Sequence, residues 1–191
     1  MQDTDIRNQV AANYGDHFTK FGETWKNQVA QLQQKFSGAI EEVRMPVEYP
    51  TDVPVLYVKA SAIIEILKFA KDEPGFEYGF LSDITVTDEE VEPRFELVYN
   101  LYSPNRHWRI RFKVRVAEGE EVPTLTGIWP GANWAEREAW DMFGVKFTGH
   151  PDLRRILMDS RWVGHPLRKD YPLRGYQVFP DAQQIDEKLL S

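Results

Sequence analysis

The chain has 191 residues, 42% of them hydrophobic and 13% aromatic, which suffices for one domain with a real core plus an extension. Its formal net charge of −7 argues against nucleic acid or an anionic membrane surface as the main partner, because both attract basic proteins. The absence of cysteine excludes disulfides, thiolate zinc sites and cysteine-ligated iron–sulfur clusters.

The N-terminal residues predict a cytoplasmic protein of bacterial type. Residues 1–22 are polar and aperiodic, so we expect a loose arm there, not a secretory signal or a transit peptide. No window of the sequence approaches eighteen apolar residues, and we therefore expect no membrane span.

Helix and strand patterns alternate over the first half of the chain. Apolar residues recur at helical spacing over 24–36, which predicts a helix. Residues 39–47 and 55–58 are predicted strands, and prolines separate them. Ser61 is a suitable N-cap for a second helix that runs through Ala70.

Three consecutive strands are predicted next, over 80–86, 94–102 and 108–116. In the last of them apolar and basic residues alternate strictly, which is typical of a sheet with one dry and one wet face. Short turns imply antiparallel neighbours, and helices then cover the dry face. The predicted fold class is α+β: an antiparallel sheet with helices on one face, in a core domain over 23–147.

The basic row of the last predicted strand consists of Arg109, Arg111, Lys113 and Arg115. These residues could bind an anion, or they could form a solvated face. The acidic runs 88–92 and 118–121 offset their charge, so we favour the solvated face.

A short helix is predicted over 134–143. Asn133 and Glu136 have the spacing of a capping box, and Gly144 suits the C-terminal cap. Arg137 and Asp141 lie four residues apart, so we expect them to pair on the helix surface.

Beyond Phe147 we expect an extended interaction segment over 148–191. Prolines follow His150 and His165 and disfavour helical geometry at both histidines. Acids and bases are nearly balanced over 133–173 and apolar runs are almost absent, so this region cannot form its own core. It must lie on another surface, either of this chain or of a partner.

Catalytic and ligand-binding motifs are weak in this sequence. Glu136, Glu138, Asp141, His150 and His165 could form a metal site, but their spacing fits ion pairs better. A Gly-x-Ser-x-Gly nucleophile turn and a glycine-rich phosphate loop are both lacking, so we expect no covalent catalysis and no NADH or ATP binding by this chain.

Two runs nevertheless resemble the defining motifs of one family, the 30 kDa peripheral-arm subunit (C-type) of proton-translocating NADH:quinone oxidoreductase, respiratory complex I. The first run comprises Glu136 to Glu138, Trp140 to Val145, Phe147 and Gly149 to Leu157, and the second is Gly164 to Leu173. The resemblance extends over about residues 55–175.

This resemblance implies a subunit without an active site or a cofactor of its own. The FMN, iron–sulfur clusters, NADH and quinone belong to other subunits of such a complex. The implied position is peripheral, on the cytoplasmic side of the bacterial inner membrane. The C-terminal stretch is implied to wrap the large quinone-site subunit, near the iron–sulfur subunits.

On this basis we expect a non-catalytic structural subunit whose motif residues face a partner. The expected partner-facing residues are Glu136, Arg137, Glu138, Trp140, Asp141, Phe143, Gly144, Phe147, His150, Asp152, Arg154, Arg155, His165, Arg168, Lys169, Asp170 and Tyr171. The alternatives are an equivalent scaffold subunit of a related membrane-bound hydrogenase or photosynthetic ferredoxin:quinone complex, and a metal-dependent hydrolase that uses Glu136, Glu138 and His150.

Overall fold

The computed structural model describes residues 20–46, 48–49 and 51–176 of the chain. Its first helix covers residues 20–35 of this range. The helix buries Phe21, Trp25 and Leu32, which recur at a spacing that places them on one side. Residues 20–22 thus belong to the helix and not to a loose arm, and the rest of that predicted arm lies outside the described residues.

A five-stranded sheet is the centre of the fold. Its strands are β1 (Ile40–Arg44), β2 (Val55–Val58), β3 (Phe80–Asp88), β4 (Phe95–Ser103) and β5 (Trp108–Val116), in the order β1-β2-β5-β4-β3. The pairs β1–β2, β3–β4 and β4–β5 are antiparallel, as short connections predict, but β2 and β5 pair parallel. They are not joined by a hairpin, because α2 and the β3–β4 hairpin lie between them in the sequence, so the sheet is mixed.

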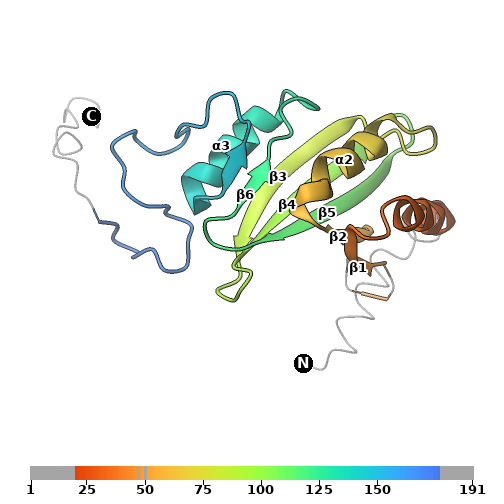
Figure 1. Ribbon diagram of the computed structural model, residues 1–191, viewed down its shortest axis with the longest axis horizontal. Coiled ribbons are helices and arrows are strands. Elements are labelled where there is room, and N and C mark those ends of the chain that lie inside the picture. Colours follow the sequence, from red (N-terminus) through yellow and green to blue (C-terminus); the bar gives the residue numbers. More distant parts are fainter. Residues whose placement is uncertain (1–19, 47, 50, 177–191) are drawn as a thin grey trace, which may run out of the picture.

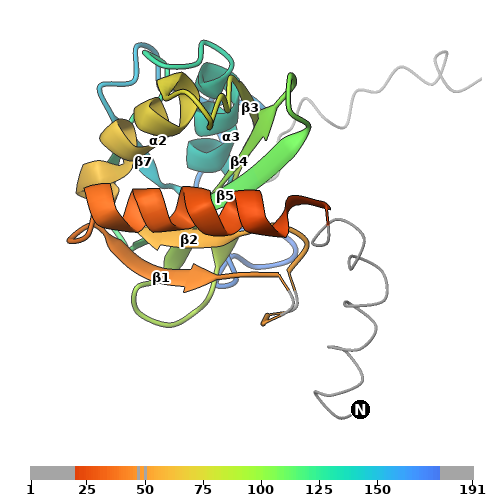
Figure 2. The same cartoon turned by 90° about the vertical axis from the view of Figure 1, so that its right-hand side faces the viewer.

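Helices cover one face of this sheet, which confirms the predicted α+β class (Figures 1 and 2). They are the first helix, α2 (Ile63–Asp72) and α3 (Ala132–Phe143). A 3-10 turn, η1 (Ala60–Ala62), precedes α2, so Ser61 lies within that turn and makes no side-chain cap. The core lies between the helices and the inward side chains of the strands, such as Leu56, Leu97 and Phe112, which are fully buried.

The opposite face of the sheet carries paired charges. Lys113 forms an ion pair with Glu96, and Arg115 pairs with Glu42 at 3.0 Å. Arg111 donates a hydrogen bond to the Asn100 side chain across the β4–β5 pair. The basic row of β5 is therefore compensated on a wet face, in line with the solvated interpretation.

Two further short strands, which the sequence pattern did not predict, flank α3 in the sequence. We call the sheet, its helices and these two strands the body of the protein. The two short strands are β6 (Glu121–Pro123) and β7 (Lys146–Thr148), and they pair parallel on either side of α3 in sequence. After β7, residues 149–176 contain no helix or strand, and we call them the C-terminal segment. In Figure 1 this segment, in blue, runs past α3, loops outward and turns back toward the rest of the molecule. Within the described ranges, no helix is long and apolar enough to cross a membrane.

Candidate functional site on helix α3 and the C-terminal segment

Helix α3 has a buried stripe that includes a carboxylate. Ala132, Glu136 and Ala139 all have relative exposures of 3% or less. Glu136 accepts hydrogen bonds from Thr124 Oγ1 at 2.5 Å and from the Leu125 amide at 2.6 Å. It forms no capping box, since the helix begins one residue before Asn133 and its N-cap is Gly131. The spacing of two alanines around Glu136 was the sequence signal that this position faces inward.

The environment of Glu136 favours its neutral form. Burial raises the pKa of Glu136 to about 7, although the hydrogen bonds from Thr124 and Leu125 act in the opposite direction. His150 lies beside it, with its Nε2 3.9 Å from Glu136 Oε2. Because the imidazole Nδ1 accepts from the Asp152 amide, we assign the ring proton to Nε2, which lies 3.2 Å from the Asn133 carbonyl oxygen.

This geometry corrects two expectations. Glu136 is sealed inside the chain and so does not face a partner. The hydrolase alternative required Glu136, Glu138 and His150 to converge, but Glu138 is exposed while the other two side chains are buried. Among the described residues, no group of three or more His, Cys, Asp or Glu side chains is placed to hold a metal ion.

Asp141, further along α3, anchors the C-terminal segment. Its Oδ2 accepts hydrogen bonds from the amides of Ile156, Leu157 and Met158 at 2.9–3.0 Å. Its Oδ1 accepts from Arg155 Nη1 at 2.5 Å. Burial alone would raise the pKa of Asp141, but these amides and the guanidinium outweigh burial and lower it.

The predicted surface pair between Arg137 and Asp141 is therefore wrong. Arg137 instead donates to the carbonyl oxygens of Arg154 and Arg155 at 3.0 and 2.9 Å. Asp141 is fully buried, so it is not a partner-facing residue either. The segment supplies several amides at once, and a carboxylate gains more from such a cluster than from one exposed arginine.

The C-terminal end of α3 is capped by the same segment. The carbonyl oxygen of Asp141 lies 3.0 Å from His165 Nδ1, and that of Met142 accepts from the Leu167 amide at 3.1 Å. Gly144 turns the chain with φ of +84°, as the sequence predicted for this cap. A Cβ at Gly144 would lie 2.7 Å from the His165 ring, so the glycine also permits this close approach.

Trp140 and His165 are part of the same contact. The two rings meet edge to face with centroids 6.2 Å apart, and the Arg155 guanidinium lies 5.5 Å from the Trp140 ring. Burial lowers the pKa of His165, while its hydrogen bond to Asp141 acts to raise it. Trp140 is thus half-buried by contacts within this chain, and its expected contact with a partner stays a prediction.

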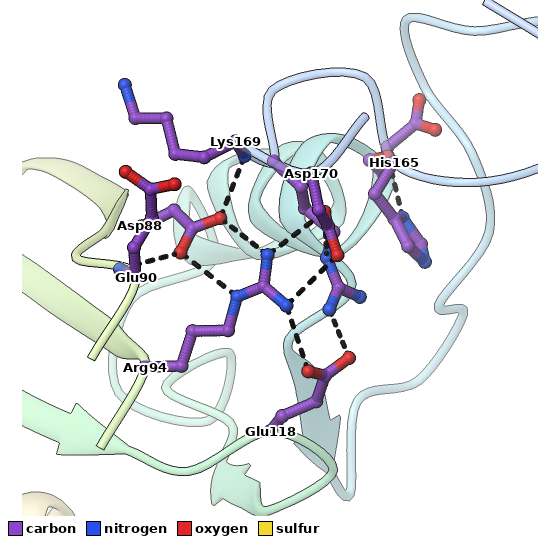
Figure 3. Close-up of polar contacts among 9 residues, drawn as sticks. Asp88, Glu90, Arg94, Glu118, His165, Lys169 and Asp170 are labelled. Carbon is purple, nitrogen blue, oxygen red and sulfur yellow. Dashed lines mark hydrogen bonds and ion pairs between the residues drawn. The ribbon is translucent and has the colours of Figure 1, made fainter. Parts of the chain in front are cut away.

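A second anchor joins the segment to the β3–β4 hairpin (Figure 3). The buried carboxylate of Asp88 accepts from Arg94 at 2.9 and 3.0 Å and from the Lys169 amide at 2.9 Å. Arg94 is the main reason that the pKa of Asp88 falls to about 2, and the amides of Lys169 and Glu90 add to this effect. Asp88 therefore fixes a backbone position 81 residues away in the sequence.

The same cluster binds the charged side chains next to Lys169. Arg94 also contacts Glu118 at 2.9 Å and Asp170 at 3.0 Å, and Arg168 forms an ion pair with Glu118. Arg168 and Asp170 were expected to pair with another subunit, but both are engaged within this chain. Asp88, Arg94 and Glu118 were not among the predicted site residues, since no periodic pattern connects them to the segment.

Aromatic contacts shape the last described part of the segment. Tyr171 stacks on Trp162 with centroids 6.4 Å apart and meets Tyr176 edge to face at 5.0 Å. Gly164, with φ of +86°, allows this arrangement, since a Cβ there would lie 2.7 Å from the Tyr171 ring. Tyr171 is therefore held by its own segment. Trp162 and Gly164 were not among the predicted site residues.

The predicted partner-facing residues thus divide into two groups. Glu138, Asp152, Arg154, Lys169 and Asp170 are exposed, and Asp170 also pairs with Arg94. Those buried or half-buried and held by contacts within the chain are Glu136, Arg137, Trp140, Asp141, Phe143, Gly144, Phe147, His150, Arg155, His165, Arg168 and Tyr171. Phe147 is 4% exposed, and Phe143 packs against the core, because β7 and α3 both belong to the body.

Comparison with known proteins identifies the family. Residues 56–177 match the family described as respiratory-chain NADH dehydrogenase, 30 kDa subunit. The chain is 46% identical over 149 residues to a C-type subunit of NADH-quinone oxidoreductase from Rhizobium etli, covering 78% of each chain. It is 48% identical over 164 residues to the C-type subunit of NADH-quinone oxidoreductase from Geotalea uraniireducens, covering 84% of this chain and 93% of that protein.

A solved structure has the same fold. It is a chain from the membrane-bound sulfane sulfur reductase, an archaeal respiratory membrane complex. The TM-score is 0.58 at 25% sequence identity, over 78% of this chain and 85% of that chain.

Proposed function

Because the chain belongs to the family of the 30 kDa subunit of respiratory-chain NADH dehydrogenase, we propose that it is a non-catalytic structural subunit of an NADH:quinone oxidoreductase. The complex transfers electrons from NADH to quinone and couples this transfer to proton translocation. The FMN, the iron–sulfur clusters and the NADH and quinone sites belong to other subunits. This chain would lie peripherally, on the cytoplasmic side of the bacterial inner membrane.

One observation supports the non-catalytic role most directly. Several ionisable residues of the two family motifs serve to position the chain: Asp141 binds three amides and Arg155, and Arg168 pairs with Glu118. Groups that are committed to several hydrogen bonds of this kind have little freedom to exchange protons with a substrate. They act as structural groups that give the C-terminal segment its shape.

The proposed docking element is the extended segment, which the sequence predicted over 148–191 and of which the structure describes residues up to 176. Its partner would be the large quinone-site subunit, with the iron–sulfur subunits nearby. The segment adds little to the core of this chain, so its length is best explained by a neighbour. Residues 177–191 of the predicted segment lie outside the described residues.

A second candidate is the equivalent subunit of a different membrane-bound respiratory complex. The structural likeness to the sulfane sulfur reductase chain favours this alternative. The two candidates share the scaffold role and differ in the redox partners that surround it.

Purification from native membranes tests the proposal. The full chain, carrying an affinity tag, should be recovered with flavin-containing and iron–sulfur subunits and with NADH:quinone oxidoreductase activity. Deletion of the chain should abolish NADH:quinone activity in membranes, while NADH:ferricyanide activity of the flavin-containing part persists. Recovery with a sulfur reductase or a hydrogenase would support the second candidate. Recovery of the chain alone would contradict both.

A further inference from the structure

We propose that Trp134 and the C-terminal segment present a preformed apolar surface, accompanied by the cations Lys169 and Arg174, that docks on an apolar surface of a neighbouring subunit bordered by carboxylates. This inference rests on the proposed function. It assigns the contact mainly to apolar side chains and not to most of the charged residues of the motifs. The motif charges shape the surface from within, and the apolar side chains make the contact.

Exposed large hydrophobic side chains are concentrated in the C-terminal segment. Five of the nine such side chains in the described residues lie in the C-terminal segment, namely Leu157, Val163, Leu167, Leu173 and Tyr176. Trp134, on the exposed side of α3, is 69% exposed. Scattered exposed hydrophobic residues are normal on a protein surface, but a concentration within one short segment marks an interaction site.

The backbone of the segment is fixed at the residues whose side chains point outward. The Leu157 amide donates to Asp141 Oδ2 at 2.9 Å, and the Leu167 amide donates to the Met142 carbonyl oxygen at 3.1 Å. The Lys169 amide donates to Asp88 Oδ2 at 2.9 Å, and in Figure 3 its side chain points away from the cluster. The backbone at these three positions is therefore ordered before a partner arrives, which lowers the entropic cost of binding.

Charge specifies the kind of partner. The segment contains six Lys or Arg residues and three Asp residues, a net charge of +3 in a chain whose total is −7. Most of its arginines have carboxylate partners within the chain: Arg154, Arg155, Arg161 and Arg168. Within the described residues, no ion pair or hydrogen bond engages the side chain of Lys169 or Arg174. Both cations are thus available for carboxylates at the border of a partner's apolar surface.

A variant with two surface leucines replaced tests this assignment in the assembled complex. Leu157→Ser/Leu167→Ser removes two exposed apolar side chains and leaves every backbone anchor in place. The matched control is Phe80→Ser/Val91→Ser, which removes two equally exposed hydrophobic side chains from strand β3 and the β3–β4 hairpin. Each tagged variant replaces the native chain, and the fraction recovered with the NADH:quinone oxidoreductase is compared with wild type.

We expect the segment variant to bind the complex roughly 100-fold more weakly, which corresponds to the loss of two buried leucine contacts. The control variant should assemble as wild type does, and both purified chains should unfold at the wild-type temperature. A charge-reversed variant, Lys169→Glu/Arg174→Glu, should assemble less well, with a loss that diminishes at high salt.

Other results would overturn the inference in distinguishable ways. If wild type is recovered with the complex and the segment variant assembles equally well, the contact lies elsewhere and the proposed function stands. If the segment mainly joins two copies of this chain, the variant changes the oligomeric state of the purified protein and leaves assembly unaltered. If even wild type is not recovered with the oxidoreductase, the proposed function fails as well.

Discussion

The sheet with its helices and the C-terminal segment obtain their shapes from different interactions. In the sheet, strands β4 and β5 pair over nine residues, and side chains such as Leu97 and Phe112 are fully buried. In the segment, ordered backbone exists without a helix or strand, and buried carboxylates of Asp88 and Asp141 hold it. A polar segment can thus take a defined shape without a core of its own, because buried carboxylates bind its backbone amides.

The difference has an energetic meaning. Apolar burial contributes roughly in proportion to area and tolerates small displacements, whereas a carboxylate that binds several amides depends on a single geometry. The body should therefore unfold as one cooperative unit. The segment should open separately, in a manner that depends on a few polar residues.

The largest expected effect follows from removal of the Asp141 carboxylate. Asp141→Ala leaves the amides of three consecutive residues and Arg155 without their acceptor, so the free energy of opening of the segment should fall by about 3 kcal/mol. Native-state hydrogen exchange at the Leu157 and Met158 amides measures this change. The sheet amides should keep their protection.

Asp152→Ala is the matched control for this variant. Asp152 pairs with Arg154 at the surface, so its loss should alter the same exchange rates by less than about 0.5 kcal/mol. Equal loss of protection in β4 and in the segment of the Asp141 variant would show that the two regions form one cooperative unit.

The next effect concerns pH and the body of the protein. The pKa of Glu136 is raised from 4.5 to about 7 by burial, so the stability that its neutral form contributes is present below pH 4.5 and is lost as the pH rises through 7. Glu136→Gln cannot ionise, and its free energy of unfolding relative to wild type should rise by about 2.5 kcal/mol from pH 5 to pH 8. Urea unfolding at the two pH values measures the difference.

Glu138→Gln provides the control, because Glu138 is exposed on the same helix. This variant should follow wild type at both pH values. If the free energy of unfolding of Glu136→Gln differs from that of wild type by the same amount at pH 5 and pH 8, Glu136 is ionised throughout this range.

The smallest effect concerns the turn after α3. Gly144→Ala places a side chain on a residue with φ of +84° and 2.7 Å from the His165 ring, and should cost about 1–2 kcal/mol of stability. The Gly144→Ala/His165→Ala variant should be less destabilised than the sum of its single variants, because the steric contact is then absent. Thermal unfolding measures both effects. Gly38→Ala, which meets no atom within 4 Å, is the control, and a loss as large as that of Gly144→Ala would argue against a specific close approach.

The sequence predicted the sheet well because its signal is local. Alternation over 108–116 reproduced the bounds of β5, and the strand over 55–58 was also found with the correct bounds. The parallel pairing of β2 with β5 was not predicted, since strand patterns identify faces and not distant neighbours. The strands β6 and β7 are only three residues long and carry no periodic pattern.

The candidate site was predicted as a region, while the roles of many of its residues were not. Charged residues on a helix usually indicate a solvated face, so Glu136 and Asp141 were assigned to the surface. Their partners are mainly loop amides, with the Thr124 hydroxyl on Glu136 and Arg155 on Asp141. Backbone amides are present whatever the residue type, so they leave no pattern in the sequence. The anchor between Asp88 and Lys169 could not be predicted for the same reason, because it connects a side chain with a backbone amide.

The Asp88 anchor has a consequence for the order of events during synthesis. Chains are synthesised from the N-terminus, so the residues of the hairpin that carries Asp88 and of the helix that carries Asp141 are made before residue 169. The segment can reach its conformation only when Asp88 and Asp141 are in place to bind its amides. If the sheet and its helices misfold, the segment therefore lacks its anchors and cannot present an ordered surface to a neighbour. Docking on a partner thus depends on correct folding of the earlier part of the chain.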